Sequence, residues 1–336
     1  MKSKQLLSNN PLNFTIMKKG LLMLGAATMM LASCTQNEVL EVSESRAIGF
    51  NGTGIDNITR ADITSSVFTH FYVYGGYGET AIFDKTEVNY DGGNWVYTPT
   101  KYWANGTWKF AGYEGGNGVT PTWSYDNGLT LEVNSNASNQ SDVVYAASSD
   151  ITVEDAANYS TPVALTFTHL LSKIQFKFLK DAPSLGGVTV KLSDFTVSGI
   201  TTNAKWEAGV QKAATSAETG SYGDFSSAEE IVANTGLTTD AFYVIPQTVG
   251  TFNITADAVV IDGAGTQIHS GQIIATVPIT DITEWTAQNY YIYTATVALS
   301  NIKDPEDPDQ QPKPIEFTGT EADDWNEPDD DNIDLN

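Results

Sequence analysis

The sequence predicts an all-β protein with a β-sandwich architecture. Apolar and polar residues alternate in many short segments, which places one face of each segment in a core. Asn-Gly and Asp-Gly turns separate these segments and supply the positive φ that tight hairpins require. Two of the longer segments change the parity of their apolar face midway, which requires a bulge or a bend. Strands that bend in this way are typical of two-sheet sandwiches.

The alternation is clearest in the second half of the chain. Strands are expected over residues 251–260, 273–279 and 291–299, each with its apolar residues on one parity. The turn signals that separate the segments are Asp91-Gly92-Gly93, Asn105-Gly106, Asp126-Asn127-Gly128 and Asp262-Gly263-Ala264-Gly265. Helical periodicity is scarce, and a helix is expected only around residues 226–233.

The two changes of parity are specific. Apolar residues of one parity at 163–167 are followed by the other parity at 174–178, so a bend is expected at 169–172. A similar change separates 188–192 from 195–197. We place a domain boundary near Ala156–Ser160, between an expected strand at 142–147 and the long strand that begins at Val163.

Composition excludes one class of partner. The 336 residues contain 17 Lys and Arg against 41 Asp and Glu, a formal net charge of −24. Such a surplus repels phosphate backbones, so no nucleic acid is expected as a partner. The length suits two domains once an export signal is removed.

The amino terminus indicates a bacterial lipoprotein. Lys18 and Lys19 precede an apolar run from Leu21 to Leu31, and small residues follow up to Cys34. The run is too short to span a bilayer, so residues 1–33 are predicted to be a signal peptide, with the true start at Met17 rather than Met1. The thiol of Cys34 then carries lipid such as palmitate and anchors the chain in the outer membrane. Cys34 is the single cysteine, so no internal disulfide is possible.

The carboxyl terminus combines a linker with a strand-like segment. Residues 303–312 are acidic and rich in proline, which is typical of an extended linker. Ile315 and Phe317 alternate with polar residues beyond it, and Trp325 follows before an acidic end. Residues 303–336 are therefore a linker with a candidate final strand.

The sequence carries no catalytic signature. His70, His169 and His269 are isolated, and no pair has the spacing of a metal site. Nucleophile elbows, phosphate loops and zincin motifs are missing from the sequence, so neither catalysis, a metal nor a cofactor is expected. Trp95, Trp103, Trp108 and Trp123 leave two interpretations open, namely core packing or aromatic faces that bind glycans. An outer-membrane lipoprotein that binds glycans is therefore the alternative function.

Several segments together resemble the fimbrillin family of Bacteroidetes, the pilins of the type V pilus, including its Mfa-like branch. The resemblance extends over essentially everything after Cys34, although Gly112 and Gly115 replace the alanine and proline common in the family. The segments that carry it are Ile58-Thr59-Arg60-Ala61, Lys101-Tyr102-Trp103, Trp108 to Tyr113, Leu165 to Ile174 and Tyr290 to Tyr293.

The resemblance implies two tandem transthyretin-like β-sandwich domains, here residues 61–157 and 158–302. It also implies a structural subunit of a cell-surface fimbrium that contributes to adhesion, with other fimbrial subunits as partners. A trypsin-like, arginine-specific protease would remove the lipidated leader, residues 34–60, together with its first strand. The C-terminal strand of the next subunit would then fill the exposed groove by strand addition.

Carried over to this sequence, the resemblance makes Ile48 and Phe50 the strand that plugs the groove. Arg60 fits the processing position, because a cut there removes that strand, and Arg46 is the competing site. Ile315 and Phe317, with Trp325 beyond them, form the candidate donor strand. The alternative for that strand is to dock on its own domain, and the sequence leaves open whether the subunit forms the shaft, tip or anchor.

Overall fold

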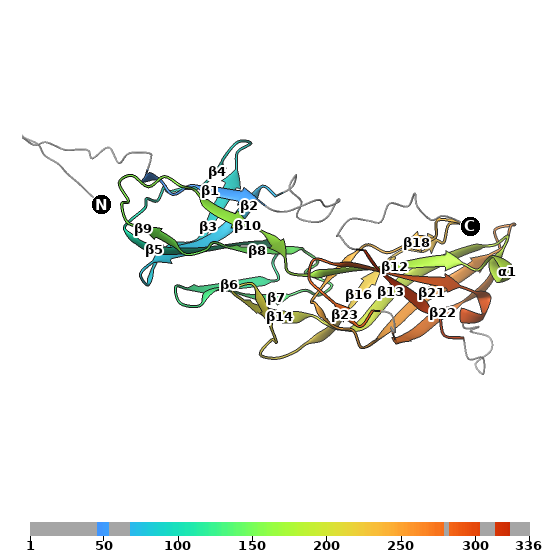
Figure 1. Ribbon diagram of the computed structural model, residues 1–336. Helices are drawn as coiled ribbons and strands as arrows, with labels where there is room; N and C mark the ends of the chain where they lie inside the picture. Colours follow the sequence, from blue (N-terminus) through green and yellow to red (C-terminus); the bar gives the residue numbers. More distant parts are fainter. Residues whose placement is uncertain (1–45, 54–67, 279–281, 303–312, 323–336) are drawn as a thin grey trace, which may run out of the picture. The chain divides into compact units, whose positions relative to one another are not determined.

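The computed structural model describes residues 46–53, 68–278, 282–302 and 313–322 (Figure 1). These residues are nearly all in strands and their connections. The helical segments are short, for example α1 (Ala182–Leu185) and a 3₁₀ turn at Leu299–Asn301. The predicted all-β class is confirmed. In the described part of the chain, no helix has the length and apolar character needed to span a bilayer.

The first half is built on one curled sheet in the order β10-β1-β4-β3-β2-β5-β8-β11, with β9 beside β5. β10 and β11 are consecutive in the chain, so both ends of this sheet meet at the same segment. The sheet encloses a core rich in aromatic rings, among them Phe71, Phe83, Trp103, Trp108 and Phe167. The strands are β1 (Phe50–Thr53), β2 (His70–Tyr77), β3 (Thr80–Tyr90), β4 (Trp95–Val96), β5 (Gly106–Gly115), β8 (Val143–Ala147), β9 (Ile151–Val153), β10 (Val163–Thr166) and β11 (Thr168–His169).

A four-stranded sheet joins residues from both halves of the sequence. Its order is β15-β14-β7-β6, with β6 (Val119–Ser124), β7 (Gly128–Asn134), β14 (Asn203–Glu207) and β15 (Val210–Lys212). A second apolar cluster holds side chains of this sheet and of the curled sheet together. It includes Tyr74, Tyr113, Tyr145, Leu131 and Trp206.

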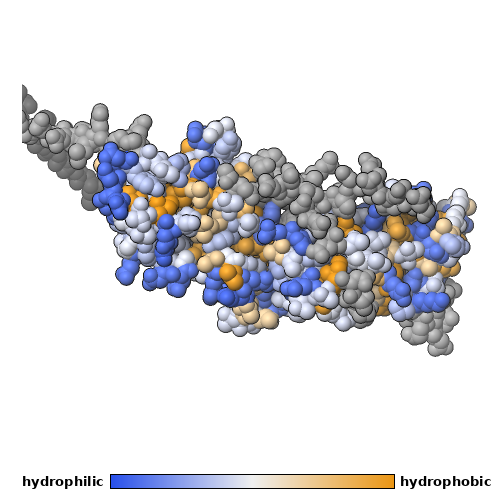
Figure 2. All heavy atoms as spheres, in the orientation of Figure 1, coloured by the Kyte–Doolittle hydropathy of each residue, from blue (hydrophilic) through white to orange (hydrophobic). Residues whose placement is uncertain are grey.

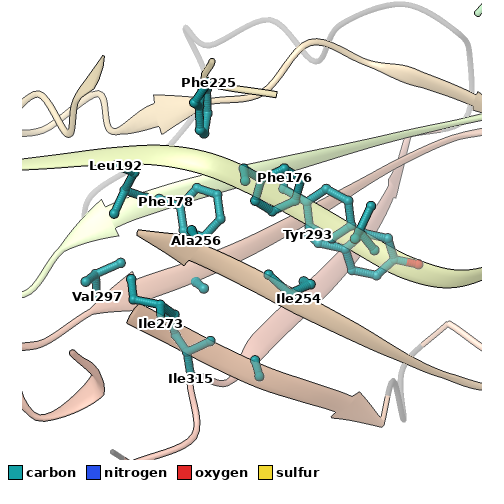
Figure 3. Packing of buried hydrophobic residues seen from close by; sticks show 14 of the residues in the cluster. Phe176, Phe178, Leu192, Phe225, Ile254, Ala256, Ile273, Tyr293, Val297 and Ile315 are labelled. Carbon is teal, nitrogen blue, oxygen red and sulfur yellow. The ribbon is translucent and has the colours of Figure 1, made fainter. Parts of the chain in front are cut away.

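The second half is a sandwich of two sheets with the orders β18-β12-β24-β25 and β16-β13-β21-β22, and β19 and β17 pair with β12 and β13. The largest apolar cluster holds side chains of both sheets and includes Ile315 together with Ile273 and Val297 (Figure 3). The strands are β12 (Ser172–Lys180), β13 (Thr189–Thr201), β16 (Thr219–Asp224), β17 (Glu229–Glu230), β18 (Leu237–Thr238), β19 (Phe242–Val244), β21 (Thr251–Ile261), β22 (Gln267–Pro278), β24 (Tyr290–Val297) and β25 (Phe317–Ala322), and β20 (Gln247–Thr248) pairs with β23 (Glu284–Trp285).

Both predicted changes of parity are present. β11 ends at His169 and β12 begins at Ser172, so the chain leaves one sheet and enters another at the expected bend. Within β13 the pairing with β21 shifts between Ser193 and Thr196, and Asp194 has a φ of 51°. The bulge at Asp194 lets Leu192 and Phe195 both lie in the core.

Three of the predicted turns connect neighbouring antiparallel strands. Gly92, Gly128 and Gly265 have φ of 93°, 71° and 85°, as such turns require. The Asp262 carboxylate supports its turn by accepting hydrogen bonds from the amides of Ala264 (2.9 Å) and Thr266 (2.8 Å). Asn105-Gly106 instead lies at the start of β5, whose first residue is Gly106, and the Asn105 side chain accepts a hydrogen bond from Ala156 N at 2.8 Å.

The helix expected around residues 226–233 is wrong. Glu229 and Glu230 form β17 and pair with Leu192 and Lys191 of β13. The amide of Ile231 then donates to Val190 O at 2.8 Å, which turns the Ile231 side chain into the core. Local propensity was overridden by this tertiary pairing.

The pairing of β10 bears on the predicted domain boundary. β10 and β11 follow residue 157 in the sequence, yet they pair with β1 and β8 of the first half. The pairing favours a changeover between His169 and Ser172 rather than at 157. The division into two domains stays a prediction, because the sequence pattern identifies a strand without identifying its partner.

Candidate assembly site

The predicted plug strand lies between two neighbours in the curled sheet. On one side, Ile48 N donates to Lys101 O at 2.9 Å and Trp103 N donates to Arg46 O at 3.0 Å. On the other side, β1 pairs in parallel with β10, and Val163 N donates to Gly49 O at 2.8 Å. The main chain of this arm, which we define as residues 46–53, is therefore bonded along both edges.

The apolar side chains of the arm enter the core. Ile48 and Phe50 are 2% and 6% exposed. The Phe50 ring lies edge-on to the rings of Phe71, Phe83, Tyr97 and Phe110, at centroid distances of 5.4–6.0 Å. Edge-on pairs of this kind add to the free energy gained from burial. The arm thus completes the core of the first half.

A tryptophan fills the space beneath the third inward position of the arm. A Cβ atom at Gly52 would lie 3.2 Å from Cε2 of the Trp95 indole. At Gly49, on the opposite face, a Cβ would meet only the Pro162 ring, at 3.8 Å. The arm occupies a place between residues 95–103 and β10, which we call the arm seat. The arm seat therefore accepts Ile, Phe and glycine on its inner face and tolerates a side chain at position 49.

One phenol hydroxyl secures the arm. Tyr97 Oη donates to Ile48 O at 2.7 Å and accepts from Lys101 N at 3.2 Å. Burial raises the pKa of Tyr97, so the group is a neutral donor across the physiological range.

The competing processing site, Arg46, lies within this bonded segment. Its carbonyl oxygen accepts the Trp103 amide hydrogen bond, and Ala47 bridges Tyr102 in antiparallel fashion. A protease must bind the chain around the scissile bond in extended form. The bond after Arg46 is not available in that form while the arm is seated.

The candidate donor strand lies on its own chain in this structure. β25 pairs with β24 and is the last strand of its sheet. Ile315 is 3% exposed, and Phe317 lies edge-on to Phe176 and Phe178 at 5.9 Å each. Asn301 Nδ2 donates to the carbonyls of Lys313 (3.0 Å) and Pro314 (3.3 Å), which holds the start of this tail, defined as residues 313–320.

Three predicted site residues, Cys34, Arg60 and Trp325, lie outside the described residues. Two of the three histidines that looked isolated in sequence have carboxylate neighbours. His169 Nδ1 lies 2.7 Å from Asp142 Oδ2 in a buried pair, and His70 Nε2 lies 3.2 Å from Glu114 Oε2. Among the residues that the structure describes, no three metal-ligating side chains gather.

Two of the four tryptophans that could have formed a glycan-binding face are buried. Trp103 and Trp108 are buried in the core of the curled sheet. Trp95 is packed against the same core, and Trp123 is half-buried against the tyrosine-rich cluster. The face in Figure 2 is largely hydrophilic, with apolar side chains scattered between the polar ones.

Comparisons with known proteins identify a matching family model and solved structures of similar fold. A family model described as fimbrillin-like matches residues 59–306. The crystal structure of a fimbrial protein from Bacteroides vulgatus is similar in fold, with a TM-score of 0.58 at 13% identity over 83% of this chain and 99% of that chain. The fimbrial anchor protein Mfa2 from Porphyromonas gingivalis aligns at 10% identity and a TM-score of 0.39 over 82% of this chain and 96% of that chain.

The comparison with curated proteins finds no match. The family model nevertheless covers most of the chain, and it confirms the family predicted from sequence. The chain belongs to the fimbrillin-like family, whose members are fimbrial structural proteins rather than enzymes.

Proposed function

We propose that this protein is a subunit of a cell-surface fimbrium. The protein is exported as a lipoprotein, and lipid attached to Cys34 anchors it in the outer membrane. An arginine-specific protease cuts it after Arg60, the arm leaves, and the tail of another subunit takes the vacated place. The assembled fimbrium contributes to adhesion. The alternative of glycan binding gains no support from the two tryptophans that lie in the core.

The observation that carries this proposal is the position of the arm. Residues 46–53 lie before the proposed cut, yet Phe50 contributes a ring to the centre of the core. A segment that completes a core and can be removed by one cut leaves a groove with unpaired main-chain groups on both sides. Such a groove is a template for strand addition.

Arg60 is favoured over Arg46 on two grounds. A cut after Arg46 would leave Ile48 and Phe50 attached to the folded chain. In addition, the Arg46 carbonyl is already an acceptor within the sheet. Both grounds select the site that frees the whole arm.

Conservative lysine variants test the cut. The purified precursor is treated with a protease specific for arginine, and the products are analysed by mass spectrometry and by detergent gels without boiling. We expect Arg60→Lys to abolish both the cut and the detergent-stable oligomers, and the matched variant Arg46→Lys to keep both. A folded precursor that is cut nowhere in residues 40–65 contradicts the proposal.

Labelling with palmitate tests lipid attachment at Cys34. Cells that express the full chain are fed labelled palmitate, and the protein is isolated from the outer-membrane fraction. Label in the wild-type chain and none in Cys34→Ala is the expected result. Equal label in both chains contradicts lipid attachment at Cys34.

A further inference from the structure

The arm and the tail share a six-residue pattern. The arm reads Ile48-Gly49-Phe50-Asn51-Gly52-Thr53, and the tail reads Ile315-Glu316-Phe317-Thr318-Gly319-Thr320. Both follow Ile-x-Phe-x-Gly-Thr. Because side chains alternate along a strand, the Ile, Phe and Gly positions lie on one face in each segment.

The shared face has the same role in both places. Ile48 and Ile315 are almost completely buried, and Phe50 and Phe317 pack edge-on against other rings. The glycine follows at a point where an added Cβ atom would crowd a neighbouring side chain. A Cβ at Gly52 would lie 3.2 Å from the Trp95 indole, and one at Gly319 would lie 2.6 Å from Ile282 Cδ1.

The positions that differ between the segments face away from the core. Thr318 in the tail and Asn51 in the arm are both exposed. Glu316 corresponds to Gly49, where an added Cβ would meet the Pro162 ring at an ordinary 3.8 Å. A glutamate at that position can therefore extend past Pro162 without displacing the main chain.

The residue that precedes the pattern in the tail is also compatible with the arm seat. Pro314 corresponds to Ala47, and proline has no N–H to donate. The bonds that hold the arm to residues 101–103 are donated by Ile48 and Trp103 rather than by Ala47. A proline at position 47 would leave these two bonds intact.

The two seats differ in how many strands border them. The tail, as β25, lies at the end of its sheet beside β24, whereas the arm lies between residues 95–103 and β10. A tail that moves into the vacant arm seat exchanges a one-sided ladder for a two-sided one. The eleven residues from Lys303 to Lys313 can span at most roughly 36–40 Å, which allows the tail to reach beyond its own sheet.

We propose that the arm seat is filled by the tail of a second copy of this chain, in the single register that puts Ile315, Phe317 and Gly319 where Ile48, Phe50 and Gly52 lie. This inference rests on the proposed function and deepens it. Since one chain carries both the groove and a strand matched to it, the protein polymerises with itself, as a shaft subunit does.

Disulfide formation between pairs of introduced cysteines tests the register. In the arm seat Asn51 lies opposite Ala164, and both residues are exposed. In the proposed register Thr318 of the second copy takes the place of Asn51. The purified chain carrying Ala164→Cys and Thr318→Cys is processed with the arginine-specific protease, which also removes Cys34, and is then oxidised. Glu316→Cys or Thr320→Cys, each with Ala164→Cys, provides matched controls two residues away, beyond the reach of a disulfide.

We expect the purified chain to form detergent-stable oligomers, and the Thr318 pair to link adjacent copies at least ten times more completely than either control. Oligomers that are linked equally well through Glu316 or Thr320, or through none of the three, overturn the register while the proposed function stands. If the purified chain stays monomeric but fimbriae containing it form on cells, the second copy is overturned as the partner and strand exchange with another subunit remains.

Discussion

The arm and the tail are two strands with one side-chain pattern in unequal surroundings. Phe50 is 6% exposed and lies among four rings, in a strand bordered on both sides. Phe317 is half-buried, in a strand that pairs with β24 at the end of its sheet. A strand at an edge can leave by breaking one ladder, whereas a central strand cannot leave without opening the sheet.

This difference indicates why a covalent cut would be needed at one end only. In the proposed assembly, the arm protects the groove until the cut is made, since an open groove would be an aggregation site. The tail needs no such cut, because its seat exposes the strand along one edge. The two seats therefore suit a plug that leaves once and a strand that is available for transfer.

The largest effect should come from the buried ring of the arm. We expect Phe50→Ala to lower the free energy of unfolding of the precursor by about 3–5 kcal/mol, since it empties a closely packed site. Phe317→Ala should cost about half as much, because its ring is only half-buried. Urea unfolding of both variants measures the difference, and an equal loss would contradict the contrast between the two seats.

Glycine at position 52 should be the next most sensitive feature. Gly52→Val drives a side chain against the Trp95 indole and should cost about 1–3 kcal/mol. Gly49→Val, which meets Pro162 at ordinary contact distance, is the matched control. Urea midpoints followed by tryptophan fluorescence compare the two. A larger loss for Gly49→Val would show that the inner face of the arm has been assigned incorrectly.

Alkaline pH tests the tyrosine-rich layer between the curled sheet and the four-stranded sheet. Burial raises the pKa of Tyr74 to about 12, and that of Tyr145 also to about 12. The unfolded chain loses these phenol protons near pH 10, before the folded chain does. Their contribution to stability is therefore complete below pH 10 and is lost as the pH rises toward 12.

Unfolding at pH 8 and pH 11 measures this loss. We expect Tyr74→Phe to lose less stability between the two pH values than the wild-type protein, whereas Tyr102→Phe, which alters an exposed ring, should behave as the wild type does. The same loss in all three proteins would mean that Tyr74 does not contribute to the pH dependence.

The smallest effect concerns the hydroxyl that secures the arm. Tyr97→Phe removes the hydrogen bond to Ile48 O and should cost about 0.5–1.5 kcal/mol. The ring contact with Phe50 remains, so the core should stay intact. Release of the arm after the protease cut, followed by size-exclusion chromatography, should be faster in this variant. Unchanged release would show that the side chains of the arm alone control its departure.

The sequence predicted the strands and the parity changes, because alternation and turn chemistry act locally. It could not predict which strands pair. β10 joins the arm rather than the second sandwich, and residues 229–231 follow β13 instead of forming a helix. The Trp95 indole beneath Gly52 also depends on a contact between segments far apart in sequence. Such features arise from tertiary packing, which local sequence patterns do not reveal.

Hydrogen exchange at β10 tests the central claim most directly, because Val163–Thr166 pair with the arm in the precursor. Its amides should be protected in the precursor, exposed in the chain that has been cut and freed of the arm, and protected again in the oligomer. Amides that stay protected after the arm has left, or that stay exposed in the oligomer, would contradict replacement of the arm by an incoming strand.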